Sequence, residues 1–450
     1  MYLDFIRSHT KNYISVKSRM KIHIVGAGPT GMSLAWEILR SGNHDITIYD
    51  RKTSAGGSWW EPEGELRDLH AHRIVFDKAF VNTHSLFEEM KIDWNDIFEP
   101  AEKDLYGFIG RSLSLKDYGA LASLAVRVLA QPTKYKGISL KEALGDITDG
   151  GQVVLEHLPL IMDGVTWNVM SAYEFVKSFD YVGMSKQYTQ RVSGRVMCDA
   201  MQRALEDVGV EFQFEKELKD VQYLKDGYTA EFTDETIIDD GMLFLCLDNS
   251  PALKFLGDNW GQDAEKKVRE STYGAINILF DFDEPVELGD DLEIAASTRL
   301  NLQPVVLADG YTVSCVICDL TEDILTTPPE ELRVRVLEEL QVPLPKQIRF
   351  GWGAEWDGVR WQFSQSSGVL NLHGQLPFFG ECPSVAMCGM MSPRNTPYSS
   401  IEAAVEVSRS LSHLTFGTRE PFNPLLLTQV ISVTFLLLIV LILIYRNRNQ

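Results

Sequence analysis

The chain has few basic residues for its size. It contains 42 Lys and Arg against 63 Asp and Glu over 450 residues, so its formal net charge is −21. A protein that binds nucleic acid needs a broad basic surface to neutralise phosphates. The composition therefore argues against a nucleic-acid partner. With 45% apolar residues, the chain is still long enough to bury the cores of two or three domains.

Cysteine is also scarce. Six cysteines are spread over the chain without the spacing of a disulfide framework, which predicts a reducing compartment. Cys315 and Cys318 form a CxxC pair, but they lie in an apolar stretch typical of a buried strand, and no second pair completes a zinc site. We expect these two residues to be structural and the chain to bind no metal.

Charge is absent from a long run near the C-terminal end. The first twenty residues have no apolar core of a secretory signal, whereas residues 421–445 carry no charge and residues 425–445 are mostly apolar. At ~1.5 Å rise per residue, a helix of this length matches the thickness of a bilayer core. A buried core helix is the alternative, but the run has no polar side to show water. The sequence therefore predicts a single membrane anchor at 424–445 with the rest of the protein in the cytosol, at the endoplasmic reticulum or the outer mitochondrial membrane in a eukaryotic cell.

The N-terminal part of the chain shows a strand, a glycine turn, a helix and a second strand. Residues 22–25 and 45–50 have the apolar pattern of buried strands, and residues 32–40 that of the helix between them. The turn Gly26-Ala-Gly-Pro-Thr-Gly31 has the G-x-G-x-x-G spacing of dinucleotide-binding proteins. The glycine pattern alone would be weak, but a complete βαβ unit of about thirty residues makes it specific.

Each residue of this unit has a physical role in binding a dinucleotide. Gly26 permits the tight turn, Gly28 lets the backbone approach a pyrophosphate, and Gly31 lets the helix pack on the strand. Asp50, at the end of the second strand, would accept hydrogen bonds from ribose hydroxyls. The helix that starts near Pro29 would direct its N-terminal N–H groups at the diphosphate.

A second glycine turn follows the acidic strand end. It is formed by Ala55-Gly-Gly-Ser-Trp59, where a longer cofactor could pass the backbone on the way to its ring. A plain NAD dehydrogenase does not need this turn. The sequence therefore favours FAD over NAD.

Three separated segments resemble the flavin-containing amine oxidoreductase superfamily, which includes monoamine and polyamine oxidases, phytoene desaturases and protoporphyrinogen oxidase. They are residues 25–59, residues 192–221 and residues 383–405. The resemblance implies an α/β fold in which a Rossmann-like FAD-binding domain of the GR2 type carries an inserted α+β substrate domain, besides the predicted transmembrane helix. The expected divisions are an FAD-binding domain over 20–66, 191–270 and 381–416, a substrate domain over 67–190 and 271–380, and the anchor over 424–445.

The resemblance also implies which residues bind the cofactor. In the family, a strand of the third segment ends at the cofactor, and the helix after it faces the flavin with its N-terminus. Here Ser399-x-x-Glu402 has the pattern of a capping box that would start this helix, so that the N–H groups of Ser400 and Ile401 stabilise negative charge on the ring. The full set of expected cofactor-binding residues is Gly26, Gly28, Pro29, Thr30, Gly31, Asp50, Arg51, Gly56, Gly57, Ser58, Trp59, Leu218, Gly389, Ser400 and Ile401.

The sequence departs from the family in the substrate domain. Many amine oxidases have a lysine that is water-bridged to the flavin, but no lysine occurs in residues 268–345, which puts rapid reaction with oxygen in doubt. Monoamine oxidases tether the flavin through a cysteine, but residues 351–380 contain none, so the resemblance implies noncovalent FAD. Ser400 replaces a family tyrosine, which leaves Trp361 and Tyr398 as candidates for an incomplete aromatic cage. Trp361 is equally compatible with core packing.

Two histidines, His70 and His72, follow the second glycine turn in a segment that resembles the family stretch running past the flavin ring. An imidazole there could exchange protons or orient a substrate near neutral pH. Two histidines in a polar turn can also be structural. We take His72 as the candidate catalytic histidine, beside Trp361 and Tyr398.

The function implied by the resemblance is an FAD-dependent oxidoreductase of the amine oxidase or desaturase type, in which a hydride passes from a substrate C–H to flavin N5. The expected substrate is a small lipophilic molecule or an amine. Two alternatives stay open. One is a noncatalytic, membrane-anchored scaffold that FAD only stabilises. The other is a flavin monooxygenase, although the middle of the chain has no second glycine fingerprint for NADPH.

Overall fold

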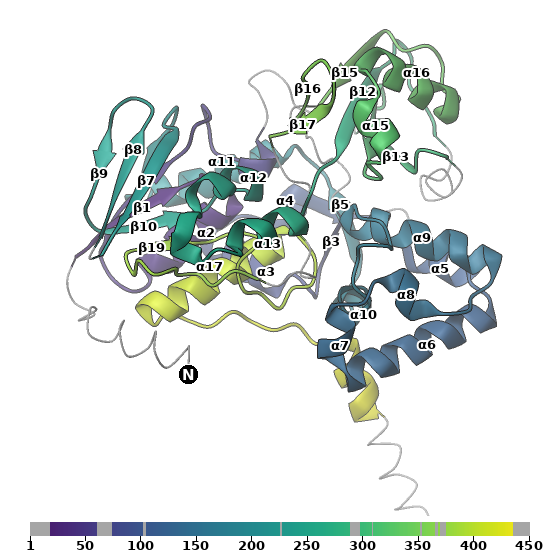
Figure 1. Ribbon diagram of the computed structural model, residues 1–450, viewed down its shortest axis with the longest axis horizontal. Coiled ribbons are helices and arrows are strands. Elements are labelled where there is room, and N and C mark those ends of the chain that lie inside the picture. The colour runs from purple at the N-terminus through teal and green to yellow at the C-terminus, as the bar shows by residue number, and fades with distance from the viewer. Residues whose placement is uncertain are drawn as a thin grey trace, which may run out of the picture.

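Three lobes make up the structure, a computed structural model shown in Figure 1. A parallel sheet forms the Rossmann-like lobe, residues 105–182 form the helical lobe, and residues 276–363 form the β lobe. The residues that the structure describes are 19–60, 74–101, 105–225, 227–288, 298–307, 309–351, 353–364, 368–369 and 375–434.

A five-stranded parallel sheet organises the Rossmann-like lobe. Its strand order is β19-β10-β1-β2-β6, and all neighbouring strands are parallel. The strands are β1 (Lys21–Val25), β2 (Asp45–Tyr49), β6 (Glu211–Gln213), β10 (Met242–Leu245) and β19 (Val385–Met387). Segments that lie far apart in the sequence therefore meet in one sheet, and their C-terminal ends face the same edge.

Alternation along the strands directs side chains into two cores, one on each face of the sheet. Ile24 belongs to the core that α2 (Pro29–Leu39) and α17 (Ile401–Phe416) cover, whereas Val25 belongs to the opposite core. Every residue of β10 is buried, because a central parallel strand is covered on both faces. The predicted βαβ unit is thus present at the expected residues.

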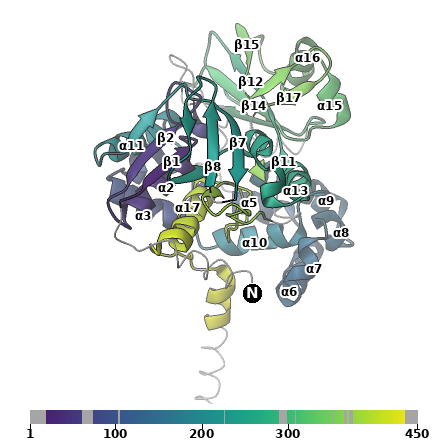
Figure 2. The ribbon, with the colours of Figure 1, turned by 60° about the vertical axis from the view of Figure 1, so that its left-hand side comes forward.

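The other elements of this lobe cover the two faces of the sheet. Helices α3 (Val81–Met90) and α11 (Gly194–Glu206) join α2 and α17 on one face. The antiparallel sheet β7-β8-β9, which stands in front in Figure 2, packs on the other face. Its strands and the remaining short elements are β7 (Leu218–Leu224), β8 (Gly227–Phe232), β9 (Ile237–Ile238), η1 (Gly57–Trp59), β3 (Ile74–Phe76), α4 (Trp94–Ile97), β4 (Phe98–Pro100), β5 (Gln187–Gln190), α12 (Asn249–Ala252), η2 (Leu253–Phe255), η3 (Gly257–Trp260) and α13 (Ala264–Ser271).

The helical lobe has a core of its own, which includes the buried side chains of Leu124, Leu155 and Trp167. Capping boxes at Ser114 and Ser171 start two of its helices, since each serine accepts an N–H that would otherwise lack a partner. The helices are α5 (Leu105–Ser112), α6 (Leu115–Ala130), α7 (Pro132–Lys136), α8 (Leu140–Leu144), α9 (Asp149–Asp163) and α10 (Ala172–Val182).

The β lobe is an antiparallel sheet, in the order β13-β14-β12-β15, with helices packed on it. Cys315 is buried within β14, as the sequence predicts. Two further short strands, β11 (Thr272–Tyr273) and β18 (Gly368–Val369), pair outside this sheet. The lobe comprises β12 (Ile276–Asp281), β13 (Leu302–Val306), β14 (Thr312–Ile317), α15 (Glu322–Thr326), α16 (Pro329–Leu340), β15 (Gln347–Phe350), β16 (Ala354–Trp356) and β17 (Trp361–Phe363).

The prediction of a C-terminal membrane anchor at 424–445 is wrong for the part of the chain that the structure describes, and the localisation derived from it is corrected as well. No helix among these residues is long and apolar enough to cross a bilayer. A helix does occupy residues 427–434, but its sequence is not continuously apolar, because hydroxyl and amide side chains lie between the apolar ones. The Thr428 N–H at its start donates to Asp180 of α10 at 2.9 Å. The later part of the predicted span, from residue 435, lies outside the described residues.

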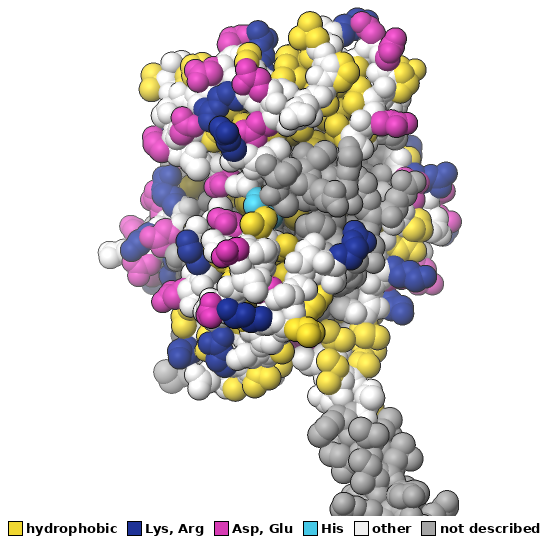
Figure 3. All heavy atoms as spheres, turned by 90° about the vertical axis from the view of Figure 1, so that its right-hand side faces the viewer, with side chains coloured by type: hydrophobic (Ala, Val, Ile, Leu, Met, Phe, Trp, Pro, Cys, Tyr) yellow, Lys and Arg dark blue, Asp and Glu magenta, His cyan; other side chains and the backbone are white. Residues whose placement is uncertain are grey.

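Charge is mixed on the face that Figure 3 presents. Lysine and arginine side chains are interspersed there with aspartate and glutamate, and the described residues form no large patch of one sign on that face. An interspersed surface of this kind gives that face no strong attraction to a polyanion.

Candidate functional site

A large cavity lies where the three lobes meet. Its volume is about 630 Å³, within the range of ~300–1,000 Å³ that small-molecule sites occupy. The wall begins at the C-terminal ends of the parallel strands with Val25, Asp50 and Cys246, and it continues to Asp163 of α9 and Gln303 of β13. Ligands of open α/β sheets bind at this end of the strands. The fold therefore places the glycine motif inside the cavity.

The first glycine turn has the geometry that its sequence predicts. Gly26 has a φ of +114°, and a Cβ on it would lie 2.1 Å from the carbonyl oxygen of Cys246. A Cβ on Gly31 would lie 2.0 Å from the carbonyl oxygen of Gly26. Only glycine permits such close packing of strand and helix. Helix α2 then begins at Gly28 and Pro29, and no described side chain caps its first N–H groups, so they can face a ligand.

The two glycine turns are in direct contact. The Gly56 N–H donates to the carbonyl oxygen of Ala27 at 2.9 Å. A Cβ on Gly28 would lie 3.3 Å from the Cα of Gly57, which itself has a φ of +59°. Side chains at these positions would fill the space between the turns, whereas glycines leave backbone facing the cavity. This cradle fits an extended dinucleotide that passes both turns.

Asp50 is held by backbone donors before any ligand binds. One carboxylate oxygen accepts the Ala27 N–H at 2.7 Å, and the other accepts the Lys52 N–H at 2.9 Å. Each oxygen keeps a second lone pair for a ribose hydroxyl. Asp50 therefore has a role beyond the predicted one, because its charge also ties the first glycine turn to the end of β2.

Lys52 lies in the cavity wall, although the sequence analysis did not select it. Its Nζ donates to the carbonyl oxygen of Gly57 at 3.0 Å and lies 4.6 Å from the centroid of the Trp60 ring. Burial lowers the pKa of Lys52 to about 7, although nearby Asp50 opposes this shift. A bound diphosphate would favour the charged ammonium. The signal available in the sequence was the basic pair Arg51-Lys52 directly after the acidic strand end.

Helix α17 reaches the cavity with its N-terminus, but its cap differs from the predicted one. The N-cap is Ser400, whose hydroxyl accepts the Ala403 N–H at 3.1 Å. Ser400 and Ile401 both line the cavity, as does Ser399 before them. The N–H groups of the first turn are therefore near the cavity, where they favour negative charge.

The predicted capping box fails because Glu402 serves a different helix. Its buried carboxylate accepts the backbone N–H groups of Asn82 and Thr83, at 3.0 and 2.9 Å, in the first turn of α3. Burial raises the pKa of Glu402 to about 7 in spite of these hydrogen bonds. A local sequence pattern could not reveal this contact, because the partners lie about 320 residues apart.

Most of the predicted cofactor residues lie in the cavity wall. Gly31 and Gly56 do not line it, but they support the two glycine turns behind it. The predicted residues that line it are Gly26, Gly28, Pro29, Thr30, Asp50, Arg51, Gly57, Ser58, Trp59, Leu218, Gly389, Ser400 and Ile401.

Of the three predicted catalytic residues, the two that the structure describes, Trp361 and Tyr398, are not brought together. Tyr398 lines the cavity, with its ring 6.0 Å from that of Tyr181. Trp361 lies instead in the core of the β lobe, where its indole N–H donates to the carbonyl oxygen of Thr327 at 2.9 Å. His72 lies outside the described residues.

On the side of the helical lobe, the cavity wall contains a carboxylate, Asp163, that sequence reasoning missed. Asp163 is the last residue of α9, and the Tyr273 hydroxyl donates to its carboxylate at 2.9 Å. Burial, and after it the charge of Glu174, raises the pKa of Asp163 to about 8. Asp163 and Tyr273 are 110 residues apart, so no local motif marks them.

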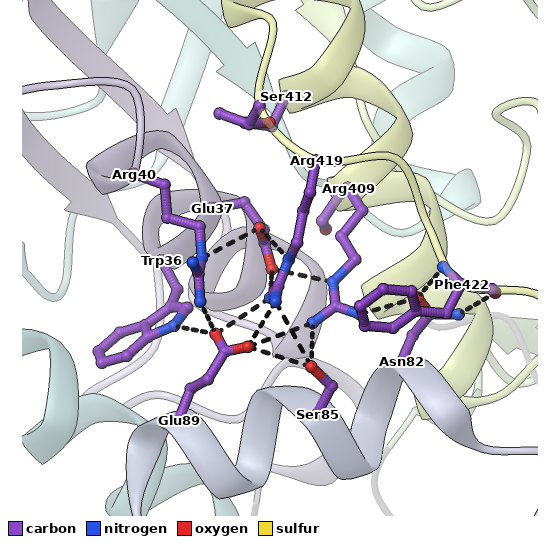
Figure 4. Close-up of polar contacts among 12 residues, drawn as sticks. Trp36, Glu37, Arg40, Asn82, Ser85, Glu89, Arg409, Ser412, Arg419 and Phe422 are labelled. Carbon is purple, nitrogen blue, oxygen red and sulfur yellow. Dashed lines mark hydrogen bonds and ion pairs between the residues drawn. The ribbon is translucent and has the colours of Figure 1, made fainter.

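A second group of charges lies between α2, α3 and α17, and Figure 4 shows its contacts. Arg409 and Glu37 are fully buried and meet at 2.9 Å. Arg419, from the segment after α17, pairs with both Glu37 and Glu89, and Arg40 also pairs with Glu89. We call these five residues the interhelix charge cluster. None of them lines the cavity.

Comparison with known proteins gives one family match and several structural likenesses. Residues 24–80 match the family described as the NAD(P)-binding Rossmann-like domain. No curated protein matches the chain. An oxidoreductase from Methanosarcina mazei aligns with a TM-score of 0.62 at 15% identity, over 87% of this chain and 100% of its own.

Two further solved structures are similar over nearly their whole length. Putrescine oxidase with bound putrescine aligns with a TM-score of 0.62 at 13% identity, over 88% of this chain and 98% of its own. A candidate protoporphyrinogen oxidase from Exiguobacterium sp. aligns with a TM-score of 0.59 at 13% identity, over 89% of this chain and 99% of its own. These likenesses confirm the resemblance to the flavin amine oxidase superfamily at the level of the fold.

Proposed function

We propose that this protein is an FAD-dependent oxidoreductase. The proposal rests mainly on the shape of the cavity. Its wall extends from the two glycine turns, which contact each other, to the N-terminus of α17. A nicotinamide dinucleotide would need the first turn only. The fold shared with putrescine oxidase and with an oxidoreductase from Methanosarcina mazei supports the same conclusion.

The wall residues fit FAD held without a covalent bond. The free N–H groups at the start of α2 suit a diphosphate, and Lys52 adds positive charge beside it. The start of α17, at Ser400 and Ile401, suits the electron-rich edge of the ring. When bound, FAD supplies a hydride acceptor. Residues 351–380 contain no cysteine at the position where monoamine oxidases tether their flavin.

The substrate would occupy the part of the cavity between the helical and β lobes. Phe179, Val182 and Tyr398 give this part of the wall apolar surface, and Asp163 adds a carboxylate. An apolar pocket with few polar groups selects a lipophilic small molecule and orients it. The surrounding lobes also keep water away from the reacting atoms, which strengthens every electrostatic contact inside.

The electron acceptor is proposed to be a molecule other than oxygen. The lysines among the described wall residues, Lys52, Lys216 and Lys254, all come from the Rossmann-like lobe. The helical and β lobes contribute none to that described wall, so the family's oxygen-activating lysine has no counterpart there. We expect slow reoxidation of the reduced flavin in air-saturated buffer and faster reoxidation by a quinone, measured by the return of flavin absorbance.

The test of FAD binding is the flavin content of the purified full-length chain. Wild-type protein should be yellow and should release its flavin on denaturation. Gly28 has a φ of −80° that other residues adopt, and its Cβ would lie 3.3 Å from the Cα of Gly57, so Gly28→Val fills the space between the turns. This variant should fold but lose FAD. Gly119→Ala is the matched control, because a Cβ there meets nothing within 4 Å. Folded but colourless wild-type protein would overturn the proposal.

A further inference from the structure

Asp163 is unlike the structural carboxylates of this protein. Buried Asp117 accepts four hydrogen bonds, two from Ser114 and two from Thr148, and these bonds hold its pKa below the usual range although burial alone would raise it. Among the described residues, Asp163 accepts hydrogen bonds from the Tyr273 hydroxyl and the Ser399 N–H. Its side chain is only partly enclosed, and it lines the cavity. With two donors in place of the four of Asp117, Asp163 keeps acceptor capacity for a ligand in the cavity.

The surroundings of Asp163 favour its protonated form. It ends helix α9, where the negative end of the helix dipole disfavours a carboxylate. Glu174 of α10 adds a second negative charge, whereas Arg394, before α17, and the Tyr273 hydroxyl oppose them. The Cys318 thiol, after β14, also faces the group, and its pKa is raised to about 12 by burial, so it stays neutral. Together these effects raise the pKa of Asp163 to about 8.

The position of Asp163 links the two halves of the cavity. Its helix belongs to the helical lobe, but its carboxylate accepts the N–H of Ser399, next to the N-cap of α17 in the Rossmann-like lobe. A substrate in front of the start of α17 would thus meet both the proposed ring edge and this carboxylate. The Tyr273 hydroxyl, from β11, also donates to the carboxylate and orients it.

We propose that Asp163, oriented by Tyr273, accepts the proton that a substrate loses during its oxidation, and that the substrates therefore carry an N–H or O–H on the carbon that is oxidised. This inference rests on the proposed function. It favours primary or secondary amines and alcohols over polyenes, because oxidation of a C–C bond to C=C releases no proton from a heteroatom.

The reaction balances as follows. The C–H bond of the substrate breaks, and its electron pair leaves with the hydrogen as hydride to the oxidant, an oxidised flavin under the proposed function. The N–H or O–H bond also breaks, and its electron pair forms the second bond of C=N or C=O. The released proton goes to the carboxylate of Asp163, which later returns it to solvent. A general base with a pKa near the working pH is suited to this task.

The first test needs neither cofactor nor substrate. Infrared spectroscopy detects the C=O stretch of a protonated carboxyl group, and in the unliganded full-length protein we expect a band that disappears as the pH rises through about 8. Asp163→Asn should remove this band. Asp258→Asn, at an exposed position, should leave it unchanged. A spectrum of Asp163→Asn identical to wild type at all pH values would overturn the inference.

The second test uses anaerobic reduction of bound flavin by a panel of primary amines and primary alcohols. The wild-type rate should rise about tenfold per pH unit up to the pKa of Asp163 and then level off. Asp163→Asn should keep its FAD and reduce it about 10²- to 10⁴-fold more slowly. Glu174→Gln removes a like charge and should move the profile to lower pH, whereas Tyr273→Phe removes a hydrogen bond to the carboxylate and should move it to higher pH.

The outcomes separate the inference from the proposed function. Wild-type protein that binds no FAD would overturn both. Wild-type protein that binds FAD but is reduced by no member of the panel would overturn the assigned substrate class. Normal rates and an unchanged pH profile in Asp163→Asn would overturn only the role of Asp163. If Asp163 were purely structural, Glu174→Gln and Tyr273→Phe would not shift the pH profile of flavin reduction in opposite directions.

Discussion

Two charged regions of the protein, the interhelix charge cluster and the cavity wall around Asp163, differ in how their charges are compensated. In the interhelix charge cluster, every carboxylate meets at least two guanidinium groups, and hydrogen bonds from Arg419 and Arg40 lower the pKa of Glu89 to about 2 although burial alone would raise it. In the cavity, Asp163 has a phenol, an amide N–H and a more distant arginine, and its pKa is raised. Paired charge holds helices together, whereas poorly compensated charge facing a cavity is available for chemistry.

The largest expected effect comes from breaking the fully buried pair. Arg409→Met leaves the fully buried Glu37 with less compensation, so the free energy of unfolding should fall by about 3–5 kcal/mol. Urea denaturation of both proteins measures this difference. The control is Arg40→Met, whose side chain is 40% exposed and should cost no more than about 1 kcal/mol. Equal losses for the two variants would contradict the assigned role of the cluster.

A smaller effect is expected from the residue that ties down the segment after α17. Arg419 contacts Glu37 and Glu89, but Arg409 still compensates Glu37 when Arg419 is removed. Arg419→Gln should therefore cost about 1–3 kcal/mol. It should also increase the rate of proteolysis within residues 417–422, because Arg419 is one of the contacts that hold this segment, beside those of Thr418 with Ser412 and of Phe422 with Asn82. Limited proteolysis with mass spectrometry checks the site, and cleavage at the wild-type rate would speak against this tether.

The contributions of the two regions to the free energy of unfolding should change with pH in opposite directions. The pKa of Asp163 is about 8 in the folded protein against 3.8 for a free aspartate, so its stabilising contribution is complete below about pH 4 and is lost as the pH rises to 8. The pKa of Glu89 is about 2 against 4.5, so its contribution is present above 4.5 and is lost as the pH falls towards 2.

Unfolding curves recorded across this pH range test the sign. Relative to Asp163→Asn, wild-type protein should lose stability between pH 4 and pH 8. Relative to Glu89→Gln, wild-type protein should lose its advantage as the pH falls below about 4.5. Slopes of the same sign for both pairs would show that the two regions do not differ in the way described.

The smallest effect is expected at Lys52, in the part of the cavity wall proposed to bind FAD. The pKa of Lys52 is about 7 without a ligand, so its charge is present at pH 6 and largely absent at pH 9. Lys52→Met should weaken FAD binding about tenfold at pH 6, since a charge-assisted hydrogen bond contributes ~1.5–3 kcal/mol, and should change it little at pH 9. Fluorescence titration with FAD measures both affinities. An effect independent of pH would assign Lys52 a packing role.

The sequence predicted those parts of the structure that depend on local geometry. The turn at Gly26 and Gly31 requires close backbone packing that only glycine allows, so the spacing of these residues was enough to place strand, turn and helix. The second turn at Gly56 and Gly57 was found for the same reason. Asp50 was placed correctly at the end of β2, but its hydrogen bond to the Ala27 N–H was not foreseen.

The rest depends on contacts between distant segments. Asp163 and Tyr273 meet only because β11, far along the chain from α9, packs against the helical lobe. Glu402 belongs to α17, but its carboxylate binds Asn82 and Thr83 of α3 instead of capping its own helix. A capping-box pattern in the sequence cannot show this contact. Trp361 was chosen as an aromatic near the flavin, but the sheet of the β lobe buries it elsewhere. The anchor at 424–445 was inferred from hydropathy, and the helix at its described start packs instead against α10.

The central claim is that the cavity of this protein binds FAD, and isothermal titration of cofactor-free full-length protein tests it most directly. FAD should bind one to one and NAD⁺ much more weakly, because NAD⁺ makes no use of the second glycine turn. Gly28→Val should abolish FAD binding while Gly119→Ala preserves it. Equal affinity for FAD and NAD⁺, or normal FAD binding by Gly28→Val, would contradict the assignment.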